Sequence, residues 1–181
     1  MSTESRPGAT RGVVGDPTEQ SLWRPLRLLQ QAMDNEIARL YAEAGIQGLK
    51  PSFVMELLRL QARGPMTITE LADSVQRTHS ATSQKVAAMR AAGFVRTTTG
   101  TDGRSKNVVL TAKARRIVGP LAAEWRATET AVAQLEEEIP YPLSQVVVDI
   151  EEALRRKSFH DRVAEHLAAD PAWAGPLGPS A

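Results

Sequence analysis

Residues 66–95 read MTITELADSVQRTHSATSQKVAAMRAAGFV, and residues 95–111 continue VRTTTGTDGRSKNVVLT. Thr69 is placed to cap a short helix. Thr78 is placed to cap a second helix, which ends at Gly93. Two short helices across a tight connection, followed by two strand-like runs, predict a winged helix-turn-helix.

Helical periodicity continues on the N-terminal side of this core. Asp16 and Pro17 predict an N-cap followed by proline at the first helical position, and Gly45 ends the pattern. Pro25 lies inside it and either kinks the helix or delays its start to about Arg24. The apolar positions are Leu22, Leu26, Leu29, Met33, Ile37 and Leu40. A second helix is expected over residues 51–63.

The C-terminal side also predicts helices. Thr111 is placed to cap a long helix, and Pro120 inside that helix should bend it. Pro140 and Pro142 separate it from one last helix, which is expected to run to Leu167. The acidic run 136–138 is interpreted as a solvated, fraying helix end. The fold class is therefore mainly α with a small β-hairpin wing.

Composition excludes several classes of protein. The 181 residues include 42% hydrophobic and 24% charged side chains, which is typical of a globular chain that buries a core. The absence of cysteine excludes disulfides and thiolate metal sites. The sequence shows neither a bilayer-spanning apolar run nor a signal peptide, so we expect a cytoplasmic protein without a membrane partner.

Charge is unevenly distributed along the chain. Residues 76–116 hold nine Lys or Arg and one acid, a local charge of +8, whereas the whole chain carries +1. A basic segment in an acidic remainder is typical of a nucleic-acid reader, because phosphate contacts supply most non-specific affinity. Charge alone leaves open the alternative of a solvated surface that is basic by chance.

The second short helix, residues 78–92, divides into a buried and an outward face. Thr82, Val86 and Met89 are spaced as a core stripe. Small and amide side chains then face outward, namely Ser80, Ala81, Ser83, Gln84 and Ala87. They suit close approach in a major groove, where an amide pairs with adenine and a methyl contacts thymine. His79 is open to two interpretations, a phosphate contact or a histidine without a ligand role.

The two strand-like runs flank a polar tip. Asp102 and Gly103 favour a tight turn, and Arg104 would project from it. A narrow minor groove attracts a guanidinium through its negative potential, and Asp102 would orient Arg104. Ser105 and Lys106 would meet the phosphate backbone. A solvated turn tip is the alternative.

Catalytic chemistry has little support in the sequence. The three histidines are His79, His160 and His166, and none has the spacing of a metal ligand relative to carboxylates. No glycine-rich phosphate loop or nucleophile elbow is present. We expect no enzymatic activity, no metal and no cofactor.

The motifs TITELADSV, THSATSQKVAAMRAAGFV and TDGRSKNVVLTAKARR follow one another without gaps. In this order they resemble the MarR family of winged helix-turn-helix transcription regulators, over roughly residues 22–167. The resemblance implies a homodimer that binds a pseudo-palindromic operator in double-stranded DNA, with helix 78–92 in the major groove and wing 97–109 in the minor groove. It also implies that a small organic effector, bound between the two parts of the protein, often relieves repression.

The expected organisation follows from this resemblance. Residues 1–15 and 170–181 are flexible tails, 16–50 form an N-terminal dimerisation helix, 51–111 the DNA-binding domain, and 112–169 the C-terminal dimerisation helices. The expected DNA contacts are Arg77, Thr78, His79, Ser80, Ala81, Ser83, Gln84, Lys85, Arg90, Asp102, Arg104, Ser105 and Lys106. The candidate effector contacts are Tyr41, Met55, Arg59 and Trp125, for each of which core packing is the favoured alternative.

The alternative interpretation is a protein with the same winged-helix fold that does not bind DNA. A winged helix also serves as a protein-interaction module, which has no need of Arg104 and Lys106 on a hairpin beside a basic helix. Binding of DNA distinguishes the two.

Overall fold

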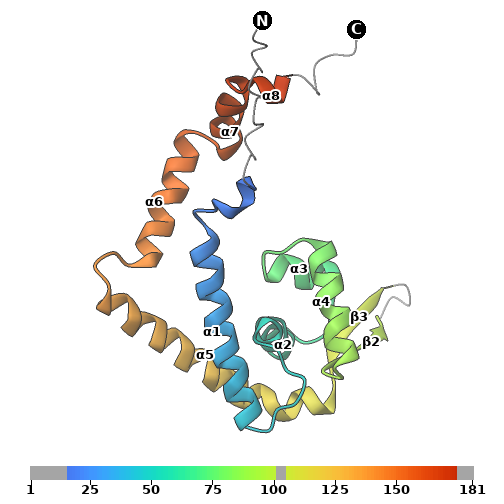
Figure 1. Ribbon diagram of the computed structural model, residues 1–181. Helices are drawn as coiled ribbons and strands as arrows, with labels where there is room; N and C mark the ends of the chain where they lie inside the picture. Colours follow the sequence, from blue (N-terminus) through green and yellow to red (C-terminus); the bar gives the residue numbers. More distant parts are fainter. Residues whose placement is uncertain (1–15, 101–104, 175–181) are drawn as a thin grey trace, which may run out of the picture. The chain divides into compact units, whose positions relative to one another are not determined.

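The computed structural model describes residues 16–100 and 105–174, and it is mainly helical with one small antiparallel sheet (Figure 1). The chain divides into two compact units, residues 1–119 and 120–181. The first contains the helix-turn-helix together with the N-terminal helix, and the dimerisation role of residues 16–50 stays a prediction.

The first unit begins with a 3-10 helix, η1, at Pro17–Glu19. The carboxylate of Asp16 accepts hydrogen bonds from the backbone N–H of Thr18 at 2.8 Å and from its hydroxyl at 2.7 Å. Helix α1 spans Arg24–Glu43 with Pro25 in its first turn, so the proline delays the start of the helix. Gly45 follows the helix with a φ of +70°, a left-handed conformation that favours glycine.

A 3-10 turn, η2 at Pro51–Phe53, leads into α2 at Val54–Arg63, which agrees with the predicted second helix. The following helix α3 spans Ile68–Ser74, and its cap differs from the prediction. Thr67, and not Thr69, is the N-cap, because its hydroxyl accepts the backbone N–H of Glu70 at 3.2 Å. The Glu70 carboxylate in turn accepts the backbone N–H of Thr67 at 2.7 Å, which completes a capping box.

Two further predicted caps are confirmed. Helix α4 spans His79–Ala91, and the hydroxyl of Thr78 accepts the backbone N–H of Ala81 at 3.2 Å. Gly93 adopts φ +77° directly after it. Helix α5 spans Ala112–Glu138, and the hydroxyl of Thr111 accepts the backbone N–H of Ala114 at 3.3 Å.

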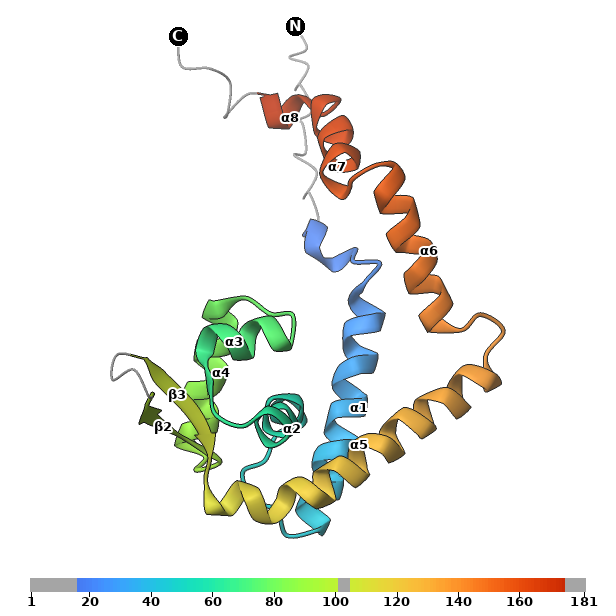
Figure 2. The same cartoon turned by 180° about the vertical axis from the view of Figure 1, so that it is seen from behind.

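The predicted hairpin is formed by β2 and β3 (Figure 2), and it belongs to a three-stranded sheet in the order β1-β3-β2. Strands β2 (Val95–Thr99) and β3 (Lys106–Leu110) pair antiparallel along their whole length. The two-residue strand β1 (Met66–Thr67) pairs with β3 on its other side. Sequence analysis missed β1, because two residues are too few to show a strand periodicity.

The core of the first unit lies where α2, α3, α4 and the sheet meet. Its largest fully buried side chains include Phe94, Leu57, Leu71 and Met89. The rings of Phe53 and Phe94 meet edge to face with their centroids 6.5 Å apart. The predicted stripe on α4 is confirmed, since Thr82, Val86 and Met89 are all buried.

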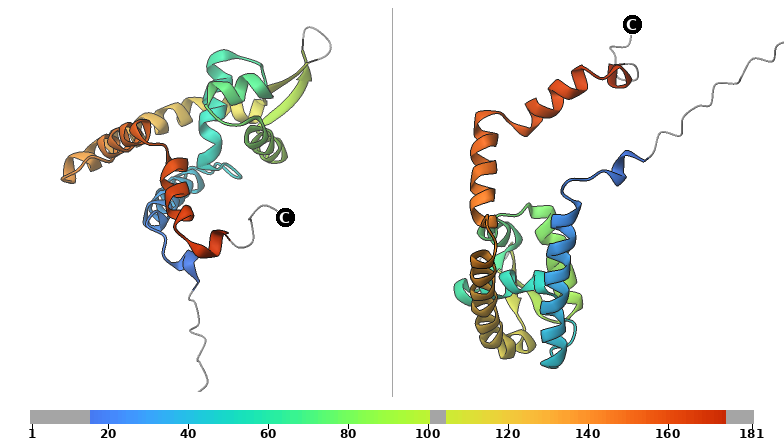
Figure 3. Two further views of the ribbon diagram at one scale, coloured as in Figure 1. Left: turned by 90° about the horizontal axis from the view of Figure 1, so that it is seen from above. Right: turned by 60° about the vertical axis from the view of Figure 1, so that its left-hand side comes forward.

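The second unit starts at Pro120, which lies inside α5. One last helix had been predicted, but the chain forms α6 at Leu143–Arg156 and α7 at Phe159–Ala168 (Figures 1 and 3). Lys157 is extended, and the hydroxyl of Ser158 caps α7 by accepting the backbone N–H of Asp161 at 3.0 Å. A local side-chain hydrogen bond therefore interrupts a helical hydrophobic pattern.

Two other C-terminal features differ from expectation. The carboxylate of Glu136 accepts the backbone N–H and the hydroxyl of Ser144, both at 2.7 Å, so it is not simply a solvated residue at a fraying end. These hydrogen bonds lower the pKa of Glu136, that of the hydroxyl most. A short helix, α8 at Pro171–Ala174, lies in the expected flexible tail. In the ranges 16–100 and 105–174 no helix is both long and apolar enough to cross a bilayer.

Candidate nucleic-acid interface

Helix α4 follows a tight turn after α3. Gln76 in that turn has φ +52°, and the backbone N–H of Arg77 donates to the carbonyl of Ala72 at 3.0 Å. Thr78 then begins α4 with its side chain as the cap. This is the connection of a helix-turn-helix, which presents the N-terminal turns of its second helix to a groove.

The outward face of α4 is the one predicted. Ser80, Gln84 and Ala87 are exposed and recur at helical spacing, opposite the buried stripe. No large apolar side chain interrupts this face, so the backbone of the helix can approach a partner closely. Its amide and hydroxyl groups supply both donors and acceptors.

Apart from Lys85, the predicted DNA contacts divide into three groups. The exposed ones are Arg77, Thr78, His79, Ser80, Ala81, Gln84, Arg90 and Lys106. Ser83 and Ser105 are partly exposed. Asp102 and Arg104 lie outside the described residues, so the tip of the wing stays a prediction.

Lys85 is placed differently from the prediction. Its ammonium donates to Oε1 of Glu56 on α2 at 2.7 Å, with 15% of the Lys85 side chain exposed and none of Glu56. A DNA-facing cation needs an exposed ammonium, whereas this one is neutralised inside the protein. Lys85 follows Thr82 by three residues and precedes Met89 by four, so it shares their buried face.

Lys113, at the start of α5, is a second cation that is engaged internally. Its ammonium donates to the carbonyl of Ala92 at 2.9 Å and to that of Gln47 at 3.3 Å. It also lies 4.1 Å from the centroid of the Phe94 ring. The basic segment therefore uses Lys85 and Lys113 for structure. Among the described residues its exposed cations are Arg77, Arg90, Arg96, Lys106, Arg115 and Arg116.

The two strands of the hairpin are paired along their whole length. Its register pairs Val95 with Leu110 and Thr99 with Lys106, and the backbone N–H of Gly100 donates to the carbonyl of Ser105 at 2.8 Å beyond the last pair. The root of the hairpin is anchored, because Val95 and Leu110 are buried. Lys106 is exposed at the outer end of the strands.

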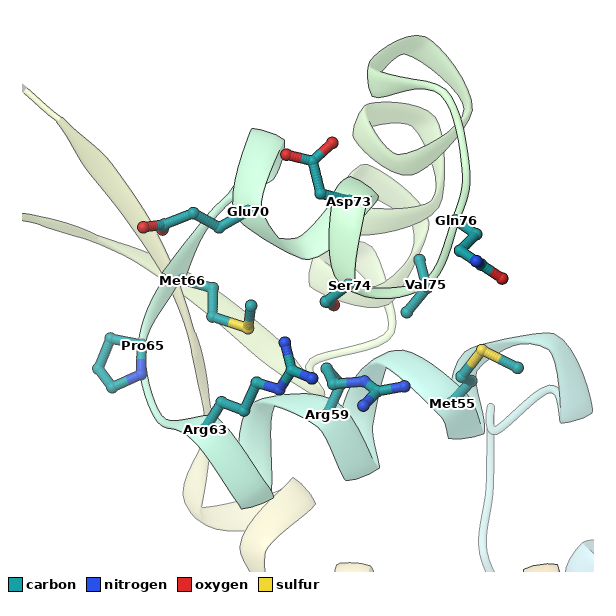
Figure 4. A pocket seen from close by; sticks show the side chains of 10 residues that line it. All are labelled: Met55, Arg59, Arg63, Pro65, Met66, Glu70, Asp73, Ser74, Val75 and Gln76. Atoms are coloured by element: carbon teal, nitrogen blue, oxygen red, sulfur yellow. The ribbon is translucent and has the colours of Figure 1, made fainter.

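The four candidate effector residues lie in different parts of the chain, and their joint role in binding an effector stays a prediction. Tyr41 is buried, and Trp125 belongs to the second unit. Met55 and Arg59 line an open groove of about 910 Å³ between α2 and α3. Figure 4 shows Arg59 and Arg63 rising from α2 on one side of the groove and Glu70 and Asp73 projecting from α3 on the other.

Sequence reasoning missed Glu56 as a partner of the second short helix. One signal was available. Glu56 falls at helical spacing among the apolar residues Phe53, at the N-cap of α2, and Leu57 and Leu60, so it faces the core. A carboxylate on such a face needs a buried partner. The identity of that partner required the tertiary structure.

Comparisons with known proteins agree with this architecture. A family model described only as HVO_A0114 matches residues 54–117. The comparison with curated proteins finds no match.

Several solved structures resemble about three quarters or more of this chain. The MepR–DNA complex of S. aureus is 18% identical with a TM-score of 0.54, and the match covers 76% of this chain and 97% of that one. The M. tuberculosis regulator MosR in complex with DNA is 19% identical with a TM-score of 0.53 and coverages of 76% and 98%. A MarR protein from Peptoclostridium difficile is 15% identical with a TM-score of 0.50 and coverages of 85% and 94%. The chain therefore has the fold of the MarR-type winged helix-turn-helix regulators.

Proposed function

We propose that this chain is a MarR-type transcription regulator, a homodimer that binds a pseudo-palindromic operator and represses until a small molecule relieves it. Helix α4 enters the major groove and the wing reaches the adjacent minor groove. In this role the protein works in the cytoplasm beside its DNA and catalyses no reaction.

One observation carries the proposal. The outward face of α4 has only small and polar side chains, and exposed cations occur in the turn before α4, on α4 itself and on the hairpin. Arg77, Arg90 and Lys106 are suited to phosphates, whereas Ser80 and Gln84 are suited to base edges. Two solved structures with this fold, of MepR and MosR, are complexes with DNA, which supports the same partner here.

The proposal of a dimer rests on large apolar side chains that are exposed in the single chain. Neither α6 nor α7 buries a residue among those described, although both helices carry large apolar side chains. Such surface is stable in water when a second chain covers it, and a two-fold interface covers the same patch on both chains. The exposed apolar residues of α6 and α7 are Leu143, Val146, Val147, Val148, Leu154, Phe159 and Val163. Helix α1 adds Leu28, Leu29 and Leu40.

Selection from random DNA tests the function with the purified full chain. We expect an enriched site with two related half-sites about one helical turn apart, since each subunit presents one α4. Arg104→Ala should weaken binding of that site while the dimer and its Tm stay unchanged. Arg126→Ala, which removes an equal charge from the exposed face of α5, is the matched control.

The rival function is a protein-interaction module. Absence of any enriched DNA sequence would favour the module, and unaltered operator affinity in Arg104→Ala would contradict the role of the wing.

An effector would have to bind one arrangement of the two α4 helices more tightly than another, because equal affinity for both shifts nothing. Aromatic acids, phenols and lipophilic drugs form a suitable panel. Operator affinity and the Tm of the free protein are measured with each compound. Compounds that raise the Tm without altering DNA binding would contradict relief by a ligand.

A further inference from the structure

The one side-chain to side-chain hydrogen bond that joins α4 to another described element is the ion pair between Lys85 and Glu56. The two residues are 29 positions apart, and their N···O distance is 2.7 Å. The Glu56 side chain is fully buried. Within the described ranges, its Oε2 atom and the buried hydroxyl of Thr82 have no hydrogen-bond partner. The buried faces of α2 and α4 thus carry an ion pair and two unpaired oxygen atoms.

Stability alone gives little reason for this arrangement. Desolvating two charges offsets most of their attraction, and apolar residues of similar volume often replace a buried ion pair without loss of stability. The two unsatisfied oxygens add to the cost of burial. A single substitution, in contrast, leaves one buried charge without its partner. A movement of α4 that separates Lys85 from Glu56 has the same consequence.

The ion pair constrains the orientation of α4 more narrowly than the apolar contacts do. Val86 and Met89 hold α4 against the core by burial, which tolerates small rotations and sliding of a helix. The hydrogen bond from Lys85 is satisfied over a narrow range of distance and angle. Gln84 is the neighbouring residue on the outward face, so rotation of α4 about its axis moves both side chains together.

We propose that the Glu56–Lys85 pair fixes the rotation of α4 and thereby sets the sequence discrimination of the protein. Both are positioning residues and neither touches DNA. The inference about discrimination rests on the proposed function, whereas the inference about the orientation of α4 does not.

The orientation is tested without DNA. The chain has no cysteine, so Gln61→Cys on α2 and Ala88→Cys on α4 provide two exposed labelling sites for spin labels. Labelled chains are diluted with unlabelled chains so that distances within one chain dominate. We expect one narrow distance distribution with the native pair and a clearly broader one after Glu56→Leu with Lys85→Met. An unchanged width would overturn the proposal.

Discrimination is tested on the site selected by the unaltered protein. In the paired apolar variant the ratio of affinities for the selected site and for scrambled DNA should fall about tenfold, with the affinity for scrambled DNA unchanged. A merely stabilising role would change the Tm and leave this ratio intact. The slope of log K against log salt should also stay unchanged, whereas loss of a phosphate contact would reduce it by about 0.9.

If the paired apolar variant does not fold, two milder single substitutions test whether the ion pair fixes the orientation of α4. Lys85→Arg keeps the charge pair and should keep both the narrow distribution and the discrimination. Glu56→Gln removes the charge of the partner at nearly constant volume and should broaden the distribution. Native behaviour of Glu56→Gln would overturn the proposal. Failure of the unaltered protein to select any DNA would refute the proposed function, and the label distances would still test the orientation.

Discussion

The described positively charged side chains of the basic segment, residues 76–116, fall into two groups, one that is paired inside the protein and one that is exposed. Lys85 and Lys113 turn inward to a carboxylate, to carbonyls and to an aromatic ring, while Arg77 and Arg90 are exposed. The predicted DNA contacts included Lys85 together with Arg77 and Arg90, because the residue type gives the charge of a side chain and not its partner. Helical spacing was the more informative signal, since it places Lys85 beside Thr82 and Met89.

We predict that the Gln84 side chain contacts a base directly in the major groove. If its amide pairs with adenine, Gln84→Ala should cost about 1 to 3 kcal/mol on the selected operator and relax the preference at one base pair in each half-site. Binding to a panel of single-base operator variants measures this. Gln134→Ala, on the exposed face of α5, is the matched control. An unchanged preference at every position would exclude Gln84 from base reading.

We predict that Lys113 stabilises the fold and does not contact DNA. Lys113→Met should lower the free energy of unfolding by about 2 kcal/mol, because it removes hydrogen bonds from a charged donor to the carbonyls of Ala92 and Gln47. The salt dependence of DNA binding should not change. Chemical denaturation and salt titrations measure the two effects, with the exposed neighbour Arg115→Met as control. A destabilisation no larger than that of Arg115→Met would contradict the assignment.

At the scale of elements, helix ends were the most predictable features. Thr78, Thr111 and Gly93 act as predicted, since caps are local hydrogen bonds or local backbone conformations. Two competing local signals caused the errors. Thr67 precedes Glu70 by the three residues of a capping box, and this pairing outcompetes Thr69. Ser158 caps a new helix in the middle of a continuous apolar pattern.

The capping box should make α3 sensitive to acid. The Thr67 backbone N–H, and then its hydroxyl, lower the pKa of Glu70 from its ordinary value of 4.5. A depressed carboxyl pKa stabilises the fold above the unfolded value, and this contribution is lost as the pH falls through the folded pKa. The stability advantage over Glu70→Gln should therefore shrink from about pH 5 downward.

Denaturant titrations of the unaltered protein and Glu70→Gln across this pH range measure that difference. Comparing the two proteins cancels the contributions of the other carboxyls with lowered pKa values, Asp16, Glu136 and Asp161. In a Thr67→Ala background the pH-dependent part should become smaller, because one of the two donors is gone. A difference that is constant with pH would exclude the capping box as its origin.

For the whole molecule, the proposed dimer makes a direct prediction. Truncation after Glu138 should abolish pairing, because it removes the exposed apolar surfaces of α6 and α7. Removal of residues 170–181 should leave the dimer intact and is the matched control. Light scattering after gel filtration measures the oligomeric state. A folded monomer of the longer truncation that still binds the operator tightly would contradict this assignment.

A point variant makes the same test without truncation. Val147→Asp places a charge within the apolar face of α6 and should weaken pairing, whereas Gln145→Asp changes a polar position and should not. Both positions are exposed in the single chain, so neither substitution disturbs a core. Equal effects of the two variants would place the interface elsewhere.

Local chemistry along the chain accounts for the helix-turn-helix, the hairpin, most helix ends and the buried stripe on α4, because caps, glycines and periodicity act within a few residues. The partners of buried charges required the folded chain. Glu56 and Lys85 are 29 residues apart, and a periodic pattern states only that each faces inward. Strand β1 likewise exists only because β3 lies beside it. Contacts between distant segments depend on how the elements pack, which local sequence does not encode.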